Sequence, residues 1–128
     1  QNIDWKAAVD RSEAKKGTTY QVACEGVWKD EVSSAWQGKQ VDVKLNVPQG
    51  MIGSLYVFFH DWNGNGREGD ITFEGRDYTV GKHDKDGAWV KLHVMREDSN
   101  DGVLNLKVKA KTGPNIMISK IALVEDVE

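Results

Sequence analysis

Hydrophobic and polar residues alternate along much of the chain, and this period of two predicts β-strands rather than helices. Residues 39–48 and 103–110 each place aliphatic side chains on one face and polar or charged side chains on the other. Residues 54–60 are apolar on both faces, which is typical of a strand in the middle of a covered sheet. Further segments with a strand pattern are residues 18–28, 88–94 and 115–124. The pattern therefore predicts an all-β domain.

Local signals between these segments refine this prediction. Residues 70–81 indicate a hairpin, because Gly75 in the EGRD turn can adopt a positive φ. The apolar phase slips by one residue within residues 115–124, and a β-bulge around Ser119 and Lys120 would absorb the slip. Residues 3–17 fit either a helical turn or irregular chain. Many short strands separated by Gly, Asn and Asp favour a two-sheet antiparallel β-sandwich with jelly-roll topology.

Composition and charge narrow the class of protein. The 128 residues, 39% of them hydrophobic, suffice for one core, so we expect a single domain spanning residues 1–128. The net charge of -3 argues against a nucleic-acid partner. No apolar run reaches the roughly 18 residues of a membrane span. The lone Cys24 excludes a disulfide scaffold, and we interpret the start at Gln1 as that of a processed piece.

The loop HDWNGNGREGD, residues 60–70, has one pattern that suggests a metal site. Asp61, Asn63 and Asn65 stand at alternate positions before a glycine, which matches the first half of an oxygen-rich calcium loop. The second half lacks the bidentate Glu, and Asp70 is one residue that could replace it. A structural calcium ion is therefore one expectation, although no cofactor is required.

The same loop also suggests a sugar site. Trp62 beside Asn63, Asn65 and Arg67 combines a flat apolar ring with hydrogen-bond donors and acceptors, which suits the C–H face and hydroxyl edge of a sugar. A third interpretation is a long turn with Trp62 folded back on the core. These alternatives stay open on the sequence alone.

Five Trp in so short a chain suggest further ligand contacts. If Val90 faces the core, alternation sends Trp89 to the opposite face, either exposed or covered by the N-terminal segment. Trp28, before a polar connection, would contact a sugar or cover the core. His83 lies in a turn rich in Asp. Asn115, just before the last strand, would contact ligand or cap backbone groups.

Nothing in the chain indicates an enzyme. His-Asp pairs for general-base chemistry can be drawn, but no Ser occupies a nucleophile elbow and Cys24 is expected to be buried. Two catalytic carboxylates cannot be singled out among the 20 acidic residues. We therefore predict a non-catalytic domain.

Four segments resemble a known group of proteins: WQGKQVDVKLNVP, LYVFFHDWNGNGREGDITFEGRDY, AWVKLHVMREDSNDG and TGPNIMISKIALVE. They are similar to the galactose-binding-like β-sandwich accessory domains, or carbohydrate-binding modules, of Bacteroides-type glycoside hydrolases with β-galactosidase-like parent enzymes. This resemblance covers about residues 35–125. It implies a jelly roll, ligand contacts from loops at one end, and an Asn opening the final strand, a place that Asn115 would take. Such modules commonly hold a structural calcium near the chain ends, but the paired Glu that usually opens the first strand is absent here.

Two functions follow as expectations. The first is a carbohydrate-binding module that tethers a secreted glycoside hydrolase to a poly- or oligosaccharide through aromatic stacking and polar contacts. Its partners would be the glycan and the catalytic domain of the parent chain, in a secreted, periplasmic or cell-surface bacterial location. The alternative is a structural accessory domain that packs on the catalytic domain and binds no sugar. If the domain had this structural role, it would expose apolar surface when isolated from the catalytic domain.

Overall fold

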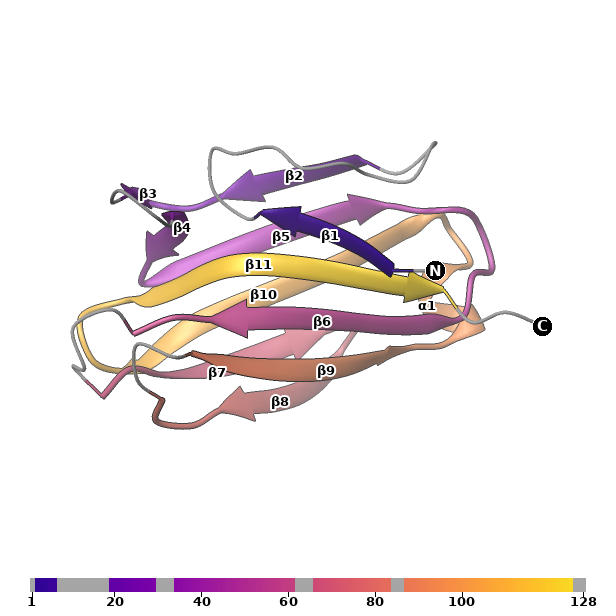
Figure 1. Cartoon of the computed structure of the whole chain (residues 1–128). Helices are drawn as coiled ribbons and strands as arrows, with labels where there is room; N and C mark the ends of the chain where they lie inside the picture. The colour runs from indigo at the N-terminus through magenta and orange to yellow at the C-terminus, as the bar shows by residue number, and fades with distance from the viewer. Residues whose placement is uncertain (1, 7–18, 30–33, 62–65, 84–86, 126–128) are drawn as a thin grey trace.

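The computed structural model describes residues 2–6, 19–29, 34–61, 66–83 and 87–125. Within these residues, two antiparallel sheets face each other, as shown in Figure 1. The first sheet has the order β3-β4-β11-β6-β9, and β1 pairs with β11. The second has the order β2-β5-β10-β7-β8. This arrangement confirms the predicted two-sheet β-sandwich.

The elements have the following bounds. The first sheet contains β1 (Asn2–Lys6), β3 (Gly26–Lys29), β4 (Ser34–Gly38), β6 (Gly53–Phe59), β9 (Ala88–Val94) and β11 (Ile116–Glu125). The second contains β2 (Thr19–Ala23), β5 (Gln40–Asn46), β7 (Glu68–Phe73), β8 (Arg76–Val80) and β10 (Val103–Thr112). A single turn of helix, α1 (Arg96–Ser99), lies between β9 and β10. No helix in the described part of the chain is long and apolar enough to cross a membrane.

The core lies between the two sheets and is built by the alternation seen in the sequence. Strand β5 buries every second residue, and its partner β10 does the same in register, pairing Leu104 with Leu45 and Val108 with Val41. Each fully buried aliphatic or aromatic side chain contributes about 1.5–3 kcal/mol. The largest fully buried side chains come from both sheets: Leu45, Leu55, Phe59, Ile71, Phe73, Leu92, Leu104, Leu106, Ile116, Met117 and Ile118.

Three local predictions agree with the structure. Strand β6 lies between β11 and β9, as its two apolar faces indicated. The register between β11 and β6 shifts between Ile118 and Lys120, where the bulge was expected. Strands β7 and β8 form a hairpin across Glu74 and Gly75, whose φ angles are 49° and 79°. Two positive φ values are what a tight two-residue hairpin turn requires.

The N-terminal third differs from the sequence-based expectation. A helical turn was one interpretation of residues 3–17, but residues 2–6 form β1, paired with β11, and residues 7–17 lie outside the described residues. The segment 18–28 is two strands, because β2 pairs with β5 in one sheet and β3 pairs with β4 in the other. Strand β4 was not predicted, since SAWQG shows no clear alternation. Its place is decided by pairing with β3 and β11.

An ion pair fastens the second sheet to the connection that leaves the first. The guanidinium of Arg76, at the start of β8, donates two hydrogen bonds of 2.8 Å to the carboxylate of Asp98 in α1. Arg76 also donates to the carbonyl of His93, and Asp98 accepts from the amide of Met95. The Arg76 hydrogen bonds hold the pKa of Asp98 below its usual range. The pair therefore stabilises the folded state most when Asp98 is ionised.

We expect Asp98→Asn to lower the free energy of unfolding by about 2 kcal/mol at neutral pH, because it removes the charge that Arg76 contacts. The pKa of Asp98 is lower in the folded than in the unfolded state, so this contribution is present above pH of about 4 and is lost as the pH falls further. Urea unfolding of the wild type and the variant at pH 7 and pH 3 measures this contribution to the free energy of unfolding. Asp77→Asn, an exposed substitution in the same hairpin, is the control. Equal effects of the two substitutions at neutral pH would contradict the role of the pair.

Candidate functional site

Three connections meet at one end of the sandwich, which we call the loop end. They follow β6, separate β8 from β9, and separate β10 from β11. The pairing of Phe59 with Ala88 and with Ile118 puts the end of β6 beside the beginnings of β9 and β11. In Figure 1 this end lies at the left, opposite α1. The described site residues on these connections, Arg67, His83 and Asn115, thereby lie at one end of the molecule.

A buried ion pair closes the loop that follows β6. Asp61 is fully buried and Arg67 is only 3% exposed, and the Nη1 of Arg67 contacts Oδ1 of Asp61. The other oxygen, Oδ2, accepts hydrogen bonds from the backbone amides of Gly66 and Arg67, at 2.9 and 3.3 Å. Two charges buried together depend on each other, because either one alone would lie unpaired in a low-dielectric interior. The ion pair thus fixes both ends of the loop.

The polar contacts continue from Arg67 across the sheet. Its Nε donates to Oδ1 of Asn115 at 2.9 Å, and Nδ2 of Asn115 donates to Oε1 of Gln37 at 2.9 Å. The network joins the loop after β6, the residue before β11, and β4. A role for Gln37 could not be predicted, because its partner Asn115 is 78 positions away along the chain. We call Asp61, Arg67, Asn115 and Gln37 the buried network.

The buried network changes the roles expected for two predicted ligand residues. Arg67 was expected to contact sugar, but its side chain is buried against Asp61 and Asn115, so in this structure it positions the loop instead. Asn115 is half-buried, and both ends of its amide are engaged. Trp62, Asn63 and Asn65, the remaining residues of the predicted sugar loop, lie outside the described residues.

Two residues of the predicted metal site, Asn63 and Asn65, lie outside the described residues, and the other two, Asp61 and Asp70, are placed as follows. Both carboxylate oxygens of Asp61 accept hydrogen bonds from Arg67 or from loop amides. Asp70 is exposed on β7, opposite Thr79 and Lys109. Among the residues that the structure describes, no group of three or more His, Cys, Asp or Glu could hold a metal ion.

An aromatic platform stands on the outer face of the first sheet, next to the loop end. Trp89 is 50% exposed, and its ring lies 4.9 Å from that of Phe58, tilted by 50°. Gly87 has a φ of 81°, and a Cβ there would collide with the Phe58 ring, so glycine is needed beside the platform. Two residues further along β9, the Nζ of Lys91 lies 5.9 Å from the centroid of the Tyr56 ring. Trp89 is thus half exposed, and residues 7–18 of the N-terminal segment, which was the alternative cover, lie outside the described residues.

The other predicted ligand residues are less informative. Nδ1 of His83 lies 2.9 Å from the carbonyl of Gly81, and its ring is 6.4 Å from that of Phe59, so it belongs to the loop end. Trp28, on β3, pairs with Ala35 on β4, and the side chain of Trp28 lies outside the described part. Trp36 is buried, with its ring 5.6 Å from that of Tyr20, which agrees with a core role. The loop end therefore offers one described exposed aromatic ring, that of Trp89.

Solved structures share this fold. A family 35 carbohydrate-binding module from Cellvibrio japonicus Abf62 superimposes with a TM-score of 0.59 and 14% identity, covering 99% of this chain and 95% of that one. A family 35 module from Clostridium thermocellum gives 0.51 and 12%, covering 98% and 99%. An exo-β-1,3-galactanase from Phanerochaete chrysosporium, solved with galactose, gives 0.58 and 13%, covering 97% of this chain and 29% of that one. No protein-family model and no curated protein sequence matches this chain. At these identities the likeness establishes the jelly-roll fold of these modules.

We expect Asp61→Asn to lower the free energy of unfolding by about 3–5 kcal/mol, since it leaves the buried guanidinium of Arg67 without its anion. The midpoint of thermal unfolding should fall by roughly 10 °C. Asp70→Asn is the matched control, because Asp70 is an exposed carboxylate that follows the same loop. If the two variants unfold at the same temperature by scanning calorimetry, the buried ion pair does not hold the loop end.

Proposed function

We propose that this chain is a non-catalytic carbohydrate-binding module that binds glycan at the loop end. The observation that carries the proposal is the exposed ring of Trp89, held by Phe58 beside loops that the buried network fixes. A rigid, half-exposed indole offers a sugar ring an apolar face at low cost in conformational entropy. The shared fold with carbohydrate-binding modules supports this proposal.

The polar part of the site is proposed to come from the loops that surround Trp89. Trp62, Asn63 and Asn65 follow β6 directly, and His83 precedes β9, so their positions along the chain place them near the same end. Asn115 and Arg67 hold these loops in place. Because only one or two rings stack on a shallow surface, we expect a dissociation constant in the micromolar to millimolar range. This corresponds to a binding free energy of about -4 to -8 kcal/mol.

In the parent protein, the module would tether a secreted glycoside hydrolase to its polysaccharide. Holding a catalytic domain close to its substrate raises the effective concentration without changing the chemistry. The 29% share that this fold takes of the galactanase chain supports such a modular arrangement. We also propose that the parent protein lies outside the cytoplasm of a bacterium. Its catalytic domain would be joined covalently to this module.

A structural accessory domain that binds no sugar is the second candidate. It would need an apolar surface to pack on its neighbour, and three large apolar side chains are exposed among the described residues: Ile52, Trp89 and Met95. They do not form one patch, because the pairing of Gly53 with Val94 puts Ile52 and Met95 at the far end of β6 from Trp89. A single exposed ring next to loops fits a sugar better than it fits a domain interface.

We expect Trp89→Ala to weaken glycan binding at least tenfold while moving the thermal midpoint by less than about 2 °C, because the ring is half exposed. A glycan array identifies the ligand, and Trp fluorescence titration measures its affinity. Met95→Ala, which removes another exposed apolar side chain at the opposite end, should bind like the wild type. A wild-type chain that binds nothing on a broad array would favour the accessory domain.

We also propose that binding requires no cofactor. Removal of divalent cations with a chelator should leave the thermal midpoint and the glycan affinity unchanged, because the Asp61 carboxylate is already held by Arg67 and the loop amides. Calorimetry with the chelator and with added calcium tests this. A midpoint that falls by several degrees on chelation would restore the calcium site predicted around Asp61 and Asp70.

A further inference from the structure

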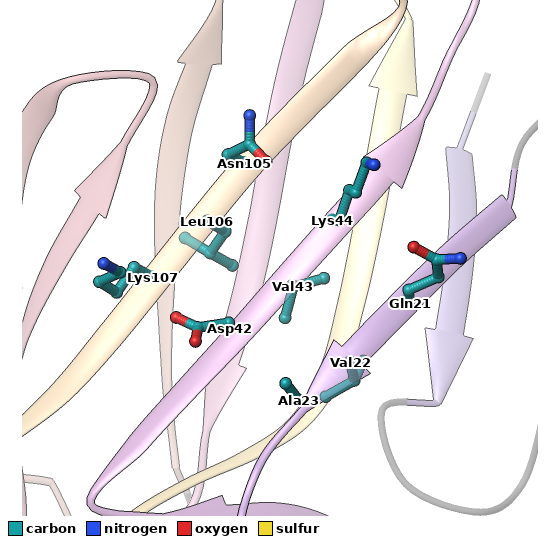
Figure 2. Close-up of a pocket in the computed structure, with 9 residues that line it drawn as sticks. All are labelled: Gln21, Val22, Ala23, Asp42, Val43, Lys44, Asn105, Leu106 and Lys107. Carbon is teal, nitrogen blue, oxygen red and sulfur yellow. The ribbon is translucent and has the colours of Figure 1, made fainter.

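The outer face of the second sheet is hollowed on the side of the molecule away from Trp89. One hollow of about 460 Å³ lies over β2, β5 and β10, and Figure 2 shows the residues that line it. A second, of about 450 Å³, lies over β7 and β8. They adjoin, because Lys107 in the first hollow pairs in register with Thr72 in the second. Together they form a shallow trough across the strands.

We propose that this trough binds an extended stretch of a neutral polysaccharide chain, as a second glycan surface distinct from the loop end. The proposal rests on the proposed function, since it takes the ligand of the chain to be a glycan. Five strands about 4.8 Å apart give a trough of roughly 19 Å, long enough for an oligosaccharide rather than a single sugar. A surface that crosses the described sheet from one edge strand, β2, to the other, β8, suits the interior of a polymer.

The chemistry of the trough favours a hydroxyl-rich ligand. Its exposed walls alternate hydrogen-bond donors and acceptors across the strands: Gln21 pairs with Lys44, Lys44 with Asn105, and Asp42 with Lys107. The three large apolar side chains exposed among the described residues all lie elsewhere. A protein interface would need an apolar centre, which this face lacks among those residues.

The charge balance excludes a polyanion as the preferred ligand. The residues that line the two hollows include two lysines, Lys44 and Lys107, and three aspartates: Asp42, Asp70 and Asp77. Nucleic acids and strongly acidic polymers require an excess of positive charge, and the whole chain carries -3. Neutral hydroxyl groups can donate to the carboxylates and accept from the ammonium groups, so a neutral glycan uses both signs.

Several of these groups are already oriented. The amide of Gln40 donates to both oxygens of Asp42 at 3.1 and 3.0 Å, and the hydroxyl of Thr72 donates to Asp77 at 3.3 Å. Side chains that are held before the ligand arrives lose less conformational entropy on binding. The trough therefore presents oriented acceptors, Asp42 and Asp77, beside the ammonium groups of its lysines.

The test compares a polymer with a short oligosaccharide. Soluble neutral polysaccharides, namely a galactan, an arabinan, a xylan and a mixed-linkage glucan, are screened by gel retardation with the whole chain. For the polymer that binds, affinity is then measured against that of its trisaccharide. Lys107→Ala and Asp42→Ala should each weaken binding of the polymer about fivefold to tenfold and weaken binding of the trisaccharide less, because the polymer fills the whole trough and the trisaccharide only part of it.

The controls separate this proposal from that for the loop end. Lys111→Ala removes an exposed lysine from the same strand outside the hollows and should bind like the wild type. Trp89→Ala should weaken both ligands. If Lys107→Ala and Asp42→Ala bind the polymer like the wild type while Trp89→Ala does not, the trough is overturned and the proposed function stands. If no polysaccharide or trisaccharide binds to the wild-type chain, both fall. Thermal midpoints within about 2 °C of the wild type establish that the variants are folded.

Discussion

Burial of one face of each sheet against the other is the constraint on which the sandwich depends. Strands β5, β7 and β10 bury alternate residues, and β6 and β11 supply the opposing apolar face. Since the period of a strand is two, each core face leaves an outer face free for other chemistry. In the first sheet that outer face carries Trp89, and in the second it carries the polar trough. Both proposed surfaces are therefore consequences of the same alternation.

The buried network is the second constraint, and it acts on the loop end. It links three segments that are distant in sequence, through Asp61 and Arg67 after β6, Asn115 before β11 and Gln37 in β4. Arg67 suits this role because its fork of donors can serve a carboxylate and an amide at once. A buried charge pair is costly to form but more costly to break, so it holds Asp61 and Arg67 together. The proposed binding surface at the loop end therefore stands on segments that this network joins.

Most strands could be predicted because their signal is local. Val41 to Val47 and Leu104 to Val108 alternate within a few residues, and Gly75 marks its own turn. Strand β4 and the division between β2 and β3 could not be predicted, because pairing across the sheets decides them. Among the site residues, Trp89 was placed correctly on the outer face by alternation alone. Arg67 was given a ligand role that its burial does not support, since a sequence does not show which arginine meets a buried carboxylate.

The sequence by itself determined the fold class, the central position of β6, the bulge in β11 and the face on which Trp89 stands. These follow from periodicity and turn chemistry, which act between near neighbours. Only the tertiary structure decided that Trp89 is half exposed, that Arg67 and Asn115 join Asp61 and Gln37, and that β2, β5 and β10 together form a hollow. Those features depend on contacts between residues far apart along the chain, because exposure and pairing exist only once the two sheets have packed.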